Sequence, residues 1–578
     1  MPASFLHGVE VIEVTTGPLP ITVVKSAVIG LVGTAPTWAV EAPAAAPAVN
    51  SPVLVSSARD AANLGPLVRG YSIPYALNAI QQQGAGQCIV VNVFDITKHN
   101  SQVTNGAYPF PALPVAQAIS LGHMGILPGS VVIQPAAAPA DWTASHAYSA
   151  GNAIKPAAGN PGGYVFKCTA AGTSGASEPS AWNQAAGSAV ADGSATWTNI
   201  GVSPYVENTD YTVDYVNGVI TQKTGGSMSA NESVTAAFSY ADPTKVQDSD
   251  IVGSVTGSAY SGIQAFQITY GSMGFFPKIL IAPGFSQTAD VASALTEMAD
   301  TVRAIALIDS PPATASAVAM ANRGVAGNAF DTSNPRAVLC YPQESFYDTG
   351  LVPAGVTLNS SGAPAAATYN AAAVGPYSQW VAGAIAAKDL AQGYWWSPSN
   401  TQINGILGPD VSLYASIVDP NCDVNNLNAA GIVTVFNAYG TGLRVWGNRS
   451  SAYPSSTAPA NFISIRRTMD VIEESVQQAM LQFIDQPISN ALIGAILASV
   501  NAFIRTLVQR GALVAGAASY DPAENPPNQV SAGQLVFDID VMPPPPAERI
   551  TFQTYIDITL LSQLGQTNAM PSSAASSN

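Results

Sequence analysis

The sequence predicts a multidomain protein of mixed class. A mostly parallel α/β domain is split by a β-rich insertion, and an α+β domain follows at the C-terminus. Three observations support this fold class. Strands and helices alternate over residues 27–96, and the alternation resumes over residues 261–455. Residues 97–260 between them lack helical periodicity, whereas residues 456–566 combine two amphipathic helices with two strands.

Apolar runs that stop at glycine or proline define the first half of the α/β domain. The run Ala27–Val32 is continuously apolar and ends at Gly33, as expected for a strand that is buried on both faces. The pattern that follows predicts a strand, two helices and another strand, at residues 51–57, 58–65, 72–86 and 87–95.

The second half repeats this alternation. Strands are expected at residues 277–284, 303–311 and 336–343, and helices at 288–302 and 314–325. Strands that alternate with helices indicate a mostly parallel sheet covered on both faces. We therefore expect the two halves to form one domain around the insertion.

The insertion has a composition of its own. Residues 135–140, "PAAAPA", predict a linker, and residues 141–201 predict a small all-β module rich in Gly, Ser, Thr and aromatic residues. Within residues 203–245, the alternating sequence 209–222 surrounds the Asn217–Gly218 pair and predicts a β-hairpin.

The aromatic residues of the module allow two interpretations. Flat rings can stack on the apolar faces of sugars, so a glycan platform could be built from Trp142, Tyr164, Trp182 and Trp197. A β module of this size has few other apolar side chains, so the same rings could form its core. The sequence leaves both interpretations open and favours the core.

The C-terminal domain is expected over residues 456–566, followed by a frayed tail at 567–578. One helix is predicted at residues 466–484, and a second is capped by Ser489 and ends at Gly511. The apolar stretch Ala491–Ile504 is too short to span a bilayer, so we expect a buried helix. Strands are predicted at residues 534–543 and 548–561.

Composition limits the possible functions. Charged residues make up only 10% of the 578 residues and hydrophobic residues make up 47%, which favours a surface that packs against copies of itself. The net charge is −16, and the longest basic run is Arg466–Arg467, so nucleic-acid binding is not expected. The four cysteines are widely spaced and predict neither a metal site nor a disulfide framework.

No catalytic, cofactor-binding or metal site is expected. The chain contains no P-loop, no HExxH and no GxSxG motif. The histidines His7, His99, His123 and His146 are scattered, and each is expected in a surface loop. We therefore predict a protein that is not an enzyme and that needs no cofactor.

The N-terminus poses a separate question. Residues 1–26 contain two short strand-like pieces, Val9–Val14 and Ile21–Val24, on either side of a Gly17–Pro18 turn. The α/β domain that begins at residue 27 does not need either piece. We interpret residues 1–26 as an extended arm whose partner lies outside its own domain.

Three regions of the chain resemble contractile phage tail sheath proteins, a family also found in tail-like bacteriocins, and the last of them is the C-terminal helices with the segments "GALVAGA" and "PPPPAERITF". The first is residues 5–36, "FLHGVEVIEVTTGPLPITVVKSAVIGLVGTAP". The second lies in residues 381–450, where the matching positions are Ala382–Gly383, Asp389, Leu427–Asn428, Gly431–Ile432, Arg444, Trp446–Gly447 and Arg449. The family's Pro-Asn is interrupted here as Pro398-Ser399-Asn400, and Ser450 replaces its usual threonine.

The resemblance implies a structural function. Sheath subunits form stacked hexameric rings around a tail tube, and contraction drives the tube through the host cell envelope without ATP. The C-terminal domain would face the tube, and the variable insertion would face outward. The implied partners are other copies of the chain, the tail tube protein, and baseplate and tail terminator proteins. The implied location is the virion tail, assembled in the host cytoplasm.

The resemblance also implies exchanged strands at both ends of the chain. An N-terminal arm carrying Val9, Val11, Val14, Ile21 and Val23 would add to the sheet of a neighbouring subunit. A C-terminal strand would do the same with Ile550, Phe552, Tyr555, Ile556 and Ile558. The alternative function is a virion surface protein that binds host-surface glycans through the aromatic module, without nucleic-acid binding or membrane insertion.

Overall fold

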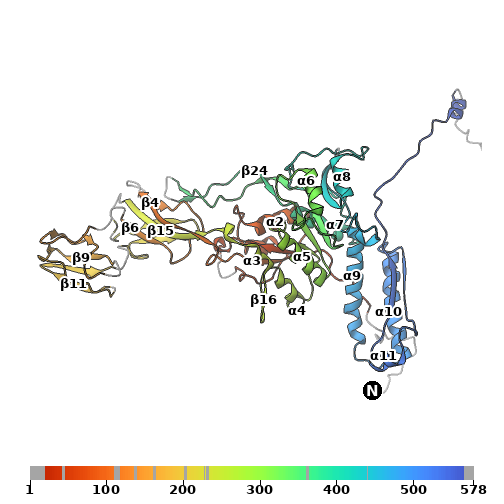
Figure 1. The fold of residues 1–578 in the computed structure, drawn as a ribbon, viewed down its shortest axis with the longest axis horizontal. Coiled ribbons are helices and arrows are strands. Elements are labelled where there is room, and N and C mark those ends of the chain that lie inside the picture. Colours follow the sequence, from red (N-terminus) through yellow and green to blue (C-terminus); the bar gives the residue numbers. More distant parts are fainter. Residues whose placement is uncertain are drawn as a thin grey trace, which may run out of the picture.

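The computed structural model describes residues 20–564, apart from residues 42–45, 110–117, 136–139, 161–163, 186, 201–204, 227, 229–232, 360–362 and 439. The N-terminal pieces around Val9, Val11 and Val14 and the predicted tail at 567–578 lie outside this range. Figure 1 shows an elongated chain, with the insertion at one end and two long C-terminal helices at the other.

An eight-stranded sheet forms the centre of the molecule. Its inner strands are parallel, and its two edge strands, β2 and β27, are antiparallel to their neighbours. In spatial order the strands are β2 (Val53–Val55), β3 (Gln87–Asn92), β1 (Val28–Gly33), β18 (Ile279–Ile281), β19 (Ile305–Asp309), β20 (Ala337–Cys340), β26 (Ile432–Ala438) and β27 (Gly442–Trp446).

One sheet contains strands from both halves of the α/β sequence. Residues of β1 pair with residues of β18, 250 positions later in the chain: Ile29 pairs with Ile279 and Leu31 with Ile281. Alternate residues of β1 point into opposite cores, because Ile29 and Leu31 belong to one apolar cluster and Val28 and Val32 to the other. The prediction of a mostly parallel sheet buried on both faces is confirmed.

Helices cover both faces of the sheet. The core of Ile29 and Leu31 is covered by α2 (Ser72–Gln82) and α7 (Ser378–Ala391). The opposite core is covered by α3 (Asp248–Val252), α5 (Ala289–Val302) and the 3₁₀ segment Gly262–Ile268. Shorter helices complete the domain: α1 (Ala58–Ala62), α4 (Thr269–Met273), α6 (Ser316–Ala321) and α8 (Asp423–Ala429).

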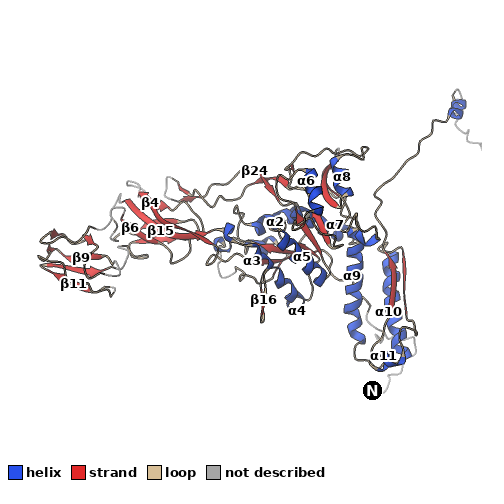
Figure 2. Cartoon of the chain, viewed as in Figure 1, coloured by secondary structure: helices blue, strands red, loops and turns tan. Residues whose placement is uncertain are grey.

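From Asn100 to Ala241, the regular elements of the insertion are strands (Figure 2). Its inner part contains the expected hairpin, β13 (Tyr211–Asp214) and β14 (Val219–Gln222), joined by β5 (Ala118–Ser120). A second sheet pairs β15 (Ser233–Ala241) with β4 (Asn100–Pro109) and β6 (Val132–Pro135). The central domain reaches out to this part, since the backbone of Met124 donates to Pro353 O at 2.8 Å and that of Gly355 to Gly122 O at 2.6 Å.

The outer module of the insertion has the all-β structure expected from its sequence. A four-stranded sheet and a two-stranded sheet surround one apolar core. The strands are β7 (Ala147–Tyr148), β8 (Ala153–Ile154), β9 (Phe166–Ala170), β10 (Gly172–Thr173), β11 (Ala189–Asp192) and β12 (Ala195–Asn199).

The C-terminal region contains the two predicted helices, α9 (Ile463–Met480) and α10 (Asn490–Gln509). Ser489 caps α10 as expected, because its hydroxyl accepts the backbone N–H of Leu492 at 3.2 Å. A short helix, α11 (Pro527–Ser531), lies between two paired strands, β28 (Ala515–Ser519) and β29 (Asp538–Met542).

The prediction that α10 is a buried helix needs correction. By length and composition α10 could cross a membrane, yet only 28% of its most apolar stretch is buried. One stripe, including Ile496, Val500 and Ile504, faces the α9–α10 core. Of the other large apolar side chains of α10, Ile493 and Leu497 are half-buried and Val508 is exposed.

Candidate assembly surfaces

The strands β28 and β29 form a two-stranded sheet against α10. Asn501 of α10 fixes this sheet, because its amide accepts from the backbone N–H of Ala518 at 2.9 Å and donates to Ala518 O at 3.0 Å. Within the described residues, each strand pairs only with the other, so neither outer edge carries a further strand, although Asn501 already bonds the backbone of Ala518 in β28. A two-stranded sheet with two open edges can accept further strands.

The chain leaves the body after β29 as a C-terminal arm, which we define as residues 543–564. Figure 1 shows this arm extending far from the C-terminal helices. Its apolar side chains are exposed, and Phe552 and Ile556 reach 86% and 99% exposure. The other exposed apolar residues of the arm are Ile550, Tyr555, Ile558, Leu560, Leu561 and Leu564.

The strand predicted at residues 548–561 is therefore corrected. Among the residues that the structure describes, none between 548 and 557 pairs with another strand, and a short 3₁₀ helix, Ile558–Gln563, follows. Ile558 thus begins a helical turn. The alternation of apolar residues is present, but the described chain holds no partner for it.

The base of the arm is anchored at one point. Arg449 forms an ion pair with Glu548, and its guanidinium lies 3.7 Å from the centre of the Phe462 ring. Beside this anchor, a groove of about 1370 Å³ separates residues 544–552 from the central-domain segments 395–400 and 416–429. The base of the arm is therefore held beside the central domain by this ion pair, with the groove between them.

The N-terminal residues 20–26 follow α9 and do not form the expected strand. Ile21 and Val23 pack against the α9–α10 core, and the backbone of Val24 donates to the Ser475 hydroxyl at 3.1 Å. Ser26 O accepts from Arg467 at 3.1 Å. This segment therefore packs on the subunit's own C-terminal region.

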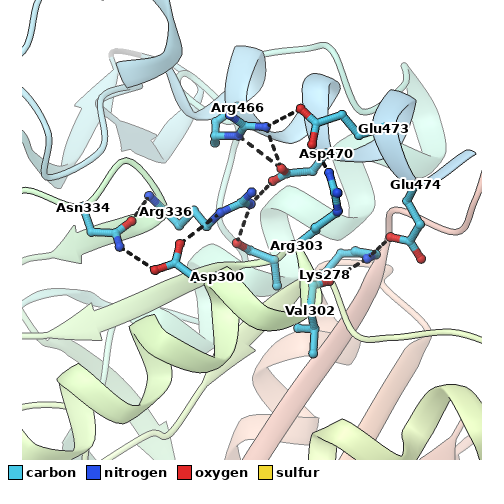
Figure 3. Close-up of polar contacts among 11 residues, drawn as sticks. Lys278, Asp300, Val302, Arg303, Asn334, Arg336, Arg466, Asp470, Glu473 and Glu474 are labelled. Carbon is cyan, nitrogen blue, oxygen red and sulfur yellow. Dashed lines mark hydrogen bonds and ion pairs between the residues drawn. The ribbon is translucent and has the colours of Figure 1, made fainter. Parts of the chain in front are cut away.

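A cluster of charges joins α9 to the central domain (Figure 3). Arg336 contacts Asp300 at 3.2 Å and also pairs with Asp470, which Arg466 contacts at 2.8 Å. The cluster contains four cations, Lys278, Arg303, Arg336 and Arg466, and four carboxylates, Asp300, Asp470, Glu473 and Glu474. Equal numbers of opposite charges hold the two regions together in a chain that is otherwise poor in charge.

Two buried ion pairs reinforce the junction. Lys278 pairs with Glu474 and donates to Val302 O at 2.9 Å, and burial lowers the pKa of Lys278 against the opposing effect of Glu474. Arg467 of α9 binds both carboxylate oxygens of Asp389 in α7, at 2.7 and 2.6 Å. Bidentate pairs of this kind fix orientation as well as distance.

Comparison with known proteins identifies the family. The family profile for the phage tail sheath protein central domain matches residues 253–451, and that for the phage tail sheath C-terminal domain matches residues 455–557. The tail sheath protein of Burkholderia phage BcepMu is 39% identical over 559 residues, covering 96% of this chain and 98% of the relative. This chain belongs to the contractile phage tail sheath family.

Other matches are less similar in sequence. The tail sheath protein of Escherichia phage P2 is 27% identical over 317 residues, which cover 55% of this chain and 72% of the relative. Among solved structures, the sheath complex of the PVC extracellular contractile injection system in the contracted state is 14% identical, with a TM-score of 0.49. That alignment covers 97% of this chain and 99% of the solved chain.

Several positions that carry the family resemblance hold the sheath fold together. A Cβ at Gly383 would lie 2.8 Å from the Gln83 side chain and 3.0 Å from the Ile80 backbone, so glycine lets α7 pack closely on α2. Gly431 has φ of +74°, in the left-handed region. Asp389 binds Arg467 of α9, and Arg449 binds Glu548 at the base of the arm.

The aromatic platform is corrected by the structure. Trp182 and Trp197 are 3% and 0% exposed in the core of the outer module, so neither ring is available to stack on a sugar. Asp192 accepts the indole N–H of Trp142 at 2.6 Å and that of Trp197 at 3.1 Å. Trp142 and Tyr164 pack partly against the same core, so the four rings do not form one surface.

The histidines also require one correction. His99 is buried rather than exposed, with Nε2 3.4 Å from Asp250 and Nδ1 accepting the backbone N–H of Asp95 at 3.0 Å. Within the residues that the structure describes, no three His, Cys, Asp or Glu side chains gather as metal ligands.

Proposed function

We propose that this chain polymerises as stacked hexameric rings around a tail tube and contracts to drive the tube through the host cell envelope. The observation that carries this proposal is the C-terminal arm, whose apolar side chains have no partner in the described chain. The partners would be other copies of the chain, the tail tube protein, and baseplate and tail terminator proteins. The assembled form would be the tail of the virion, built in the host cytoplasm, with no catalytic step.

Strand exchange would join the subunits. The open edges of β28 and β29 could receive the arms of neighbouring subunits, through main-chain hydrogen bonds that depend little on side chains. Each hydrogen bond contributes roughly 0.5–1.5 kcal/mol. One arm would therefore bind its neighbour weakly, whereas the many arms of a tube would together bind strongly. Head-to-tail contacts that do not close a ring produce helical tubes.

The elongated shape supports an arrangement in which one end of the subunit faces the tail tube and the other end faces outward. The insertion and the α9–α10 region lie at opposite ends of the molecule (Figure 1). The exposed apolar side chains around α10 include Leu481, Ile484 and Val514, which suits a region surrounded by tube and neighbours. The insertion would then point away from the tube.

The charge cluster at α9 supports movement of the central and C-terminal regions as one unit. Separating them would expose paired charges such as Lys278–Glu474 and Arg336–Asp470 without their partners. Contraction would then change contacts between subunits, while the arms keep them connected.

Removing residues 1–19 tests the N-terminal part of the exchange. We expect a folded chain that no longer forms tubes, because residues 20–26 keep their packing on α9 while the exchanged piece is lost. Negative-stain microscopy would report tubes, and circular dichroism would report folding. Tubes of normal length from this truncated chain would contradict the tethering role of the N-terminus.

Removing the outer module tests the alternative glycan function, for which the comparisons give no support. We expect a chain in which residues 141–201 are replaced by a short Gly-Ser linker to assemble and contract normally, since the module's core is its own. The control is Trp197→Ala, which should unfold the module alone at a cost of about 3–5 kcal/mol. Loss of host adsorption by otherwise intact particles would favour the glycan function.

A further inference from the structure

We propose that a cavity at the carboxyl edge of the eight-stranded sheet binds a small neutral ring that carries an amide group. The cavity measures about 270 Å³ and lies within the central domain. Its occupation would be independent of strand exchange and of contraction. Three features support this site: the place of the cavity in the sheet, the side chains that line it, and a buried amide without a partner.

The cavity lies where the strand order of the sheet reverses. β1 is placed between β3 and β18, and the later strands continue from β18 towards the opposite edge. Between β1 and β3 the chain passes through α2 on one face, and between β18 and β19 it passes through α5 on the other. Ser72, which bonds Thr34 just after β1, and the segment 283–285 after β18 both line the cavity. Ligands of open α/β sheets bind outside the carboxyl ends of the strands at this point.

The start of α2 offers no free amide for a phosphate. The backbone N–H of Ser72 donates to the Thr34 hydroxyl at 3.0 Å, and that of Ile73 donates to Thr34 O at 2.9 Å. The third residue of the helix is Pro74, which has no N–H group. Phosphate sites at helix N-termini need such groups. A phosphorylated ligand, such as a nucleotide, therefore does not suit this cavity.

The charged groups of the cavity are already paired with one another. Arg69 and Asp348 are its only charged lining residues, and they contact each other at 3.2 Å. Asp348 also accepts the Tyr75 hydroxyl and the backbone N–H of Gly350, at 2.8 and 2.7 Å. A charged ligand would lose its hydration here without gaining an unpaired partner. The occupant is therefore expected to be neutral.

Aromatic rings form the apolar part of the lining. Tyr75 and Phe346 meet edge to face with their centroids 5.9 Å apart, and Phe285 is half-buried beside the same cavity. Such rings favour a flat partner in a stacked or edge-to-face contact. The volume is just below the roughly 300–1,000 Å³ of pockets that hold drug-sized molecules. A single ring suits this space better than a larger molecule.

Gln379 supplies the specific polar contact. This residue is 2% exposed and lines the cavity from the first turn of α7. Its Nε2 lies 3.1 Å from the position that a Cβ of Gly375 would take, and Gly375 lines the cavity too. The side-chain amide of Gln379 finds no hydrogen-bond partner among the described residues. It therefore presents a donor and an acceptor, which a carboxamide or lactam on the ligand would satisfy.

Binding of benzamide to the full-length chain, measured by saturation-transfer NMR, tests the site. Benzamide is a neutral aromatic ring with one carboxamide, and benzoate has the same shape with a negative charge. We expect benzamide to bind, and benzoate to bind at least about tenfold more weakly because nothing offsets its lost hydration. Gln379→Leu should weaken benzamide binding roughly tenfold, since the apolar lining remains and the hydrogen bonds are lost. Absence of benzamide binding, or equal binding to the unmodified and Gln379→Leu chains, would overturn the assignment.

Two substitutions in the strand β24 (Ala371–Gly375) locate the binding. Ala373 lines the cavity, so Ala373→Trp should fill it and abolish benzamide binding. The matched control is Ala372→Trp, at an exposed neighbour outside the lining, which should leave binding unchanged while circular dichroism shows both chains folded. Equal loss of binding in both variants would show that benzamide does not occupy the cavity. If benzamide does not bind and Ala373→Trp stops tube formation, the cavity receives a side chain of a second copy and the ligand site is wrong.

Discussion

Replacing Asp389 with alanine is expected to lower the free energy of unfolding by about 3–5 kcal/mol, because a buried Arg467 guanidinium would lose its carboxylate partner. The Arg467 side chain is 4% exposed and binds both oxygens of Asp389. Urea unfolding of a chain that lacks the C-terminal arm would measure the effect without interference from polymerisation.

Two further variants decide whether the effect is due to an uncompensated charge. Asp300→Ala removes a carboxylate that is 52% exposed and should cost at most about 1 kcal/mol. Replacing both partners, Asp389→Leu with Arg467→Met, should recover most of the lost stability, since an apolar pair leaves no buried charge alone. Equal stability of the Asp389→Ala chain and the unmodified chain would show that the pair does not hold the junction.

Ending the chain after Arg549 is expected to abolish tube formation and leave a folded monomer. The deletion removes the exposed apolar residues from Ile550 to Leu564, whereas Glu548 keeps its ion pair with Arg449. Main-chain hydrogen bonds and apolar burial would both be lost at every contact of the polymer. Analytical ultracentrifugation would measure the monomer, and negative-stain microscopy would show whether tubes form.

A shorter truncation provides the control. Removing residues 567–578 alone takes away the predicted frayed tail and should leave tube formation intact. A chain without residues 550–578 that still forms tubes would show that the arm does not connect subunits.

The central domain was predictable because its signals are local. A continuous apolar run such as Ala27–Val32 indicates burial on both faces, and the same kind of run at residues 279–281 indicates a neighbouring strand. Caps and stops such as Ser489 gave helix positions close to those observed. The domain boundaries assigned from the sequence stay predictions, because nothing in the fold or in the relatives tests them.

Other features depend on distant residues and could not be read from the sequence. The partners Asp389 and Arg467 are 78 positions apart, and no local pattern connects them. The amino-acid composition of the module is compatible with Trp182 and Trp197 forming either a core or a platform. Only the fold shows that both rings lie in the core. Residues 548–561 were predicted as a strand from their sequence pattern, but a strand requires a partner, and the described residues contain none for it.

The outer module enters and leaves the insertion at one place. Ala140 bridges to Ile154, Ile154 pairs with Phe166, and the backbone of Ile200 donates to Val165 O at 3.0 Å, so both ends of the module meet on the same strands. A foreign domain whose termini lie close together could take the place of the module without changing the chain path on either side. In an assembled tube, every subunit would then carry one copy, and the sheath would become a regular array for displaying cargo.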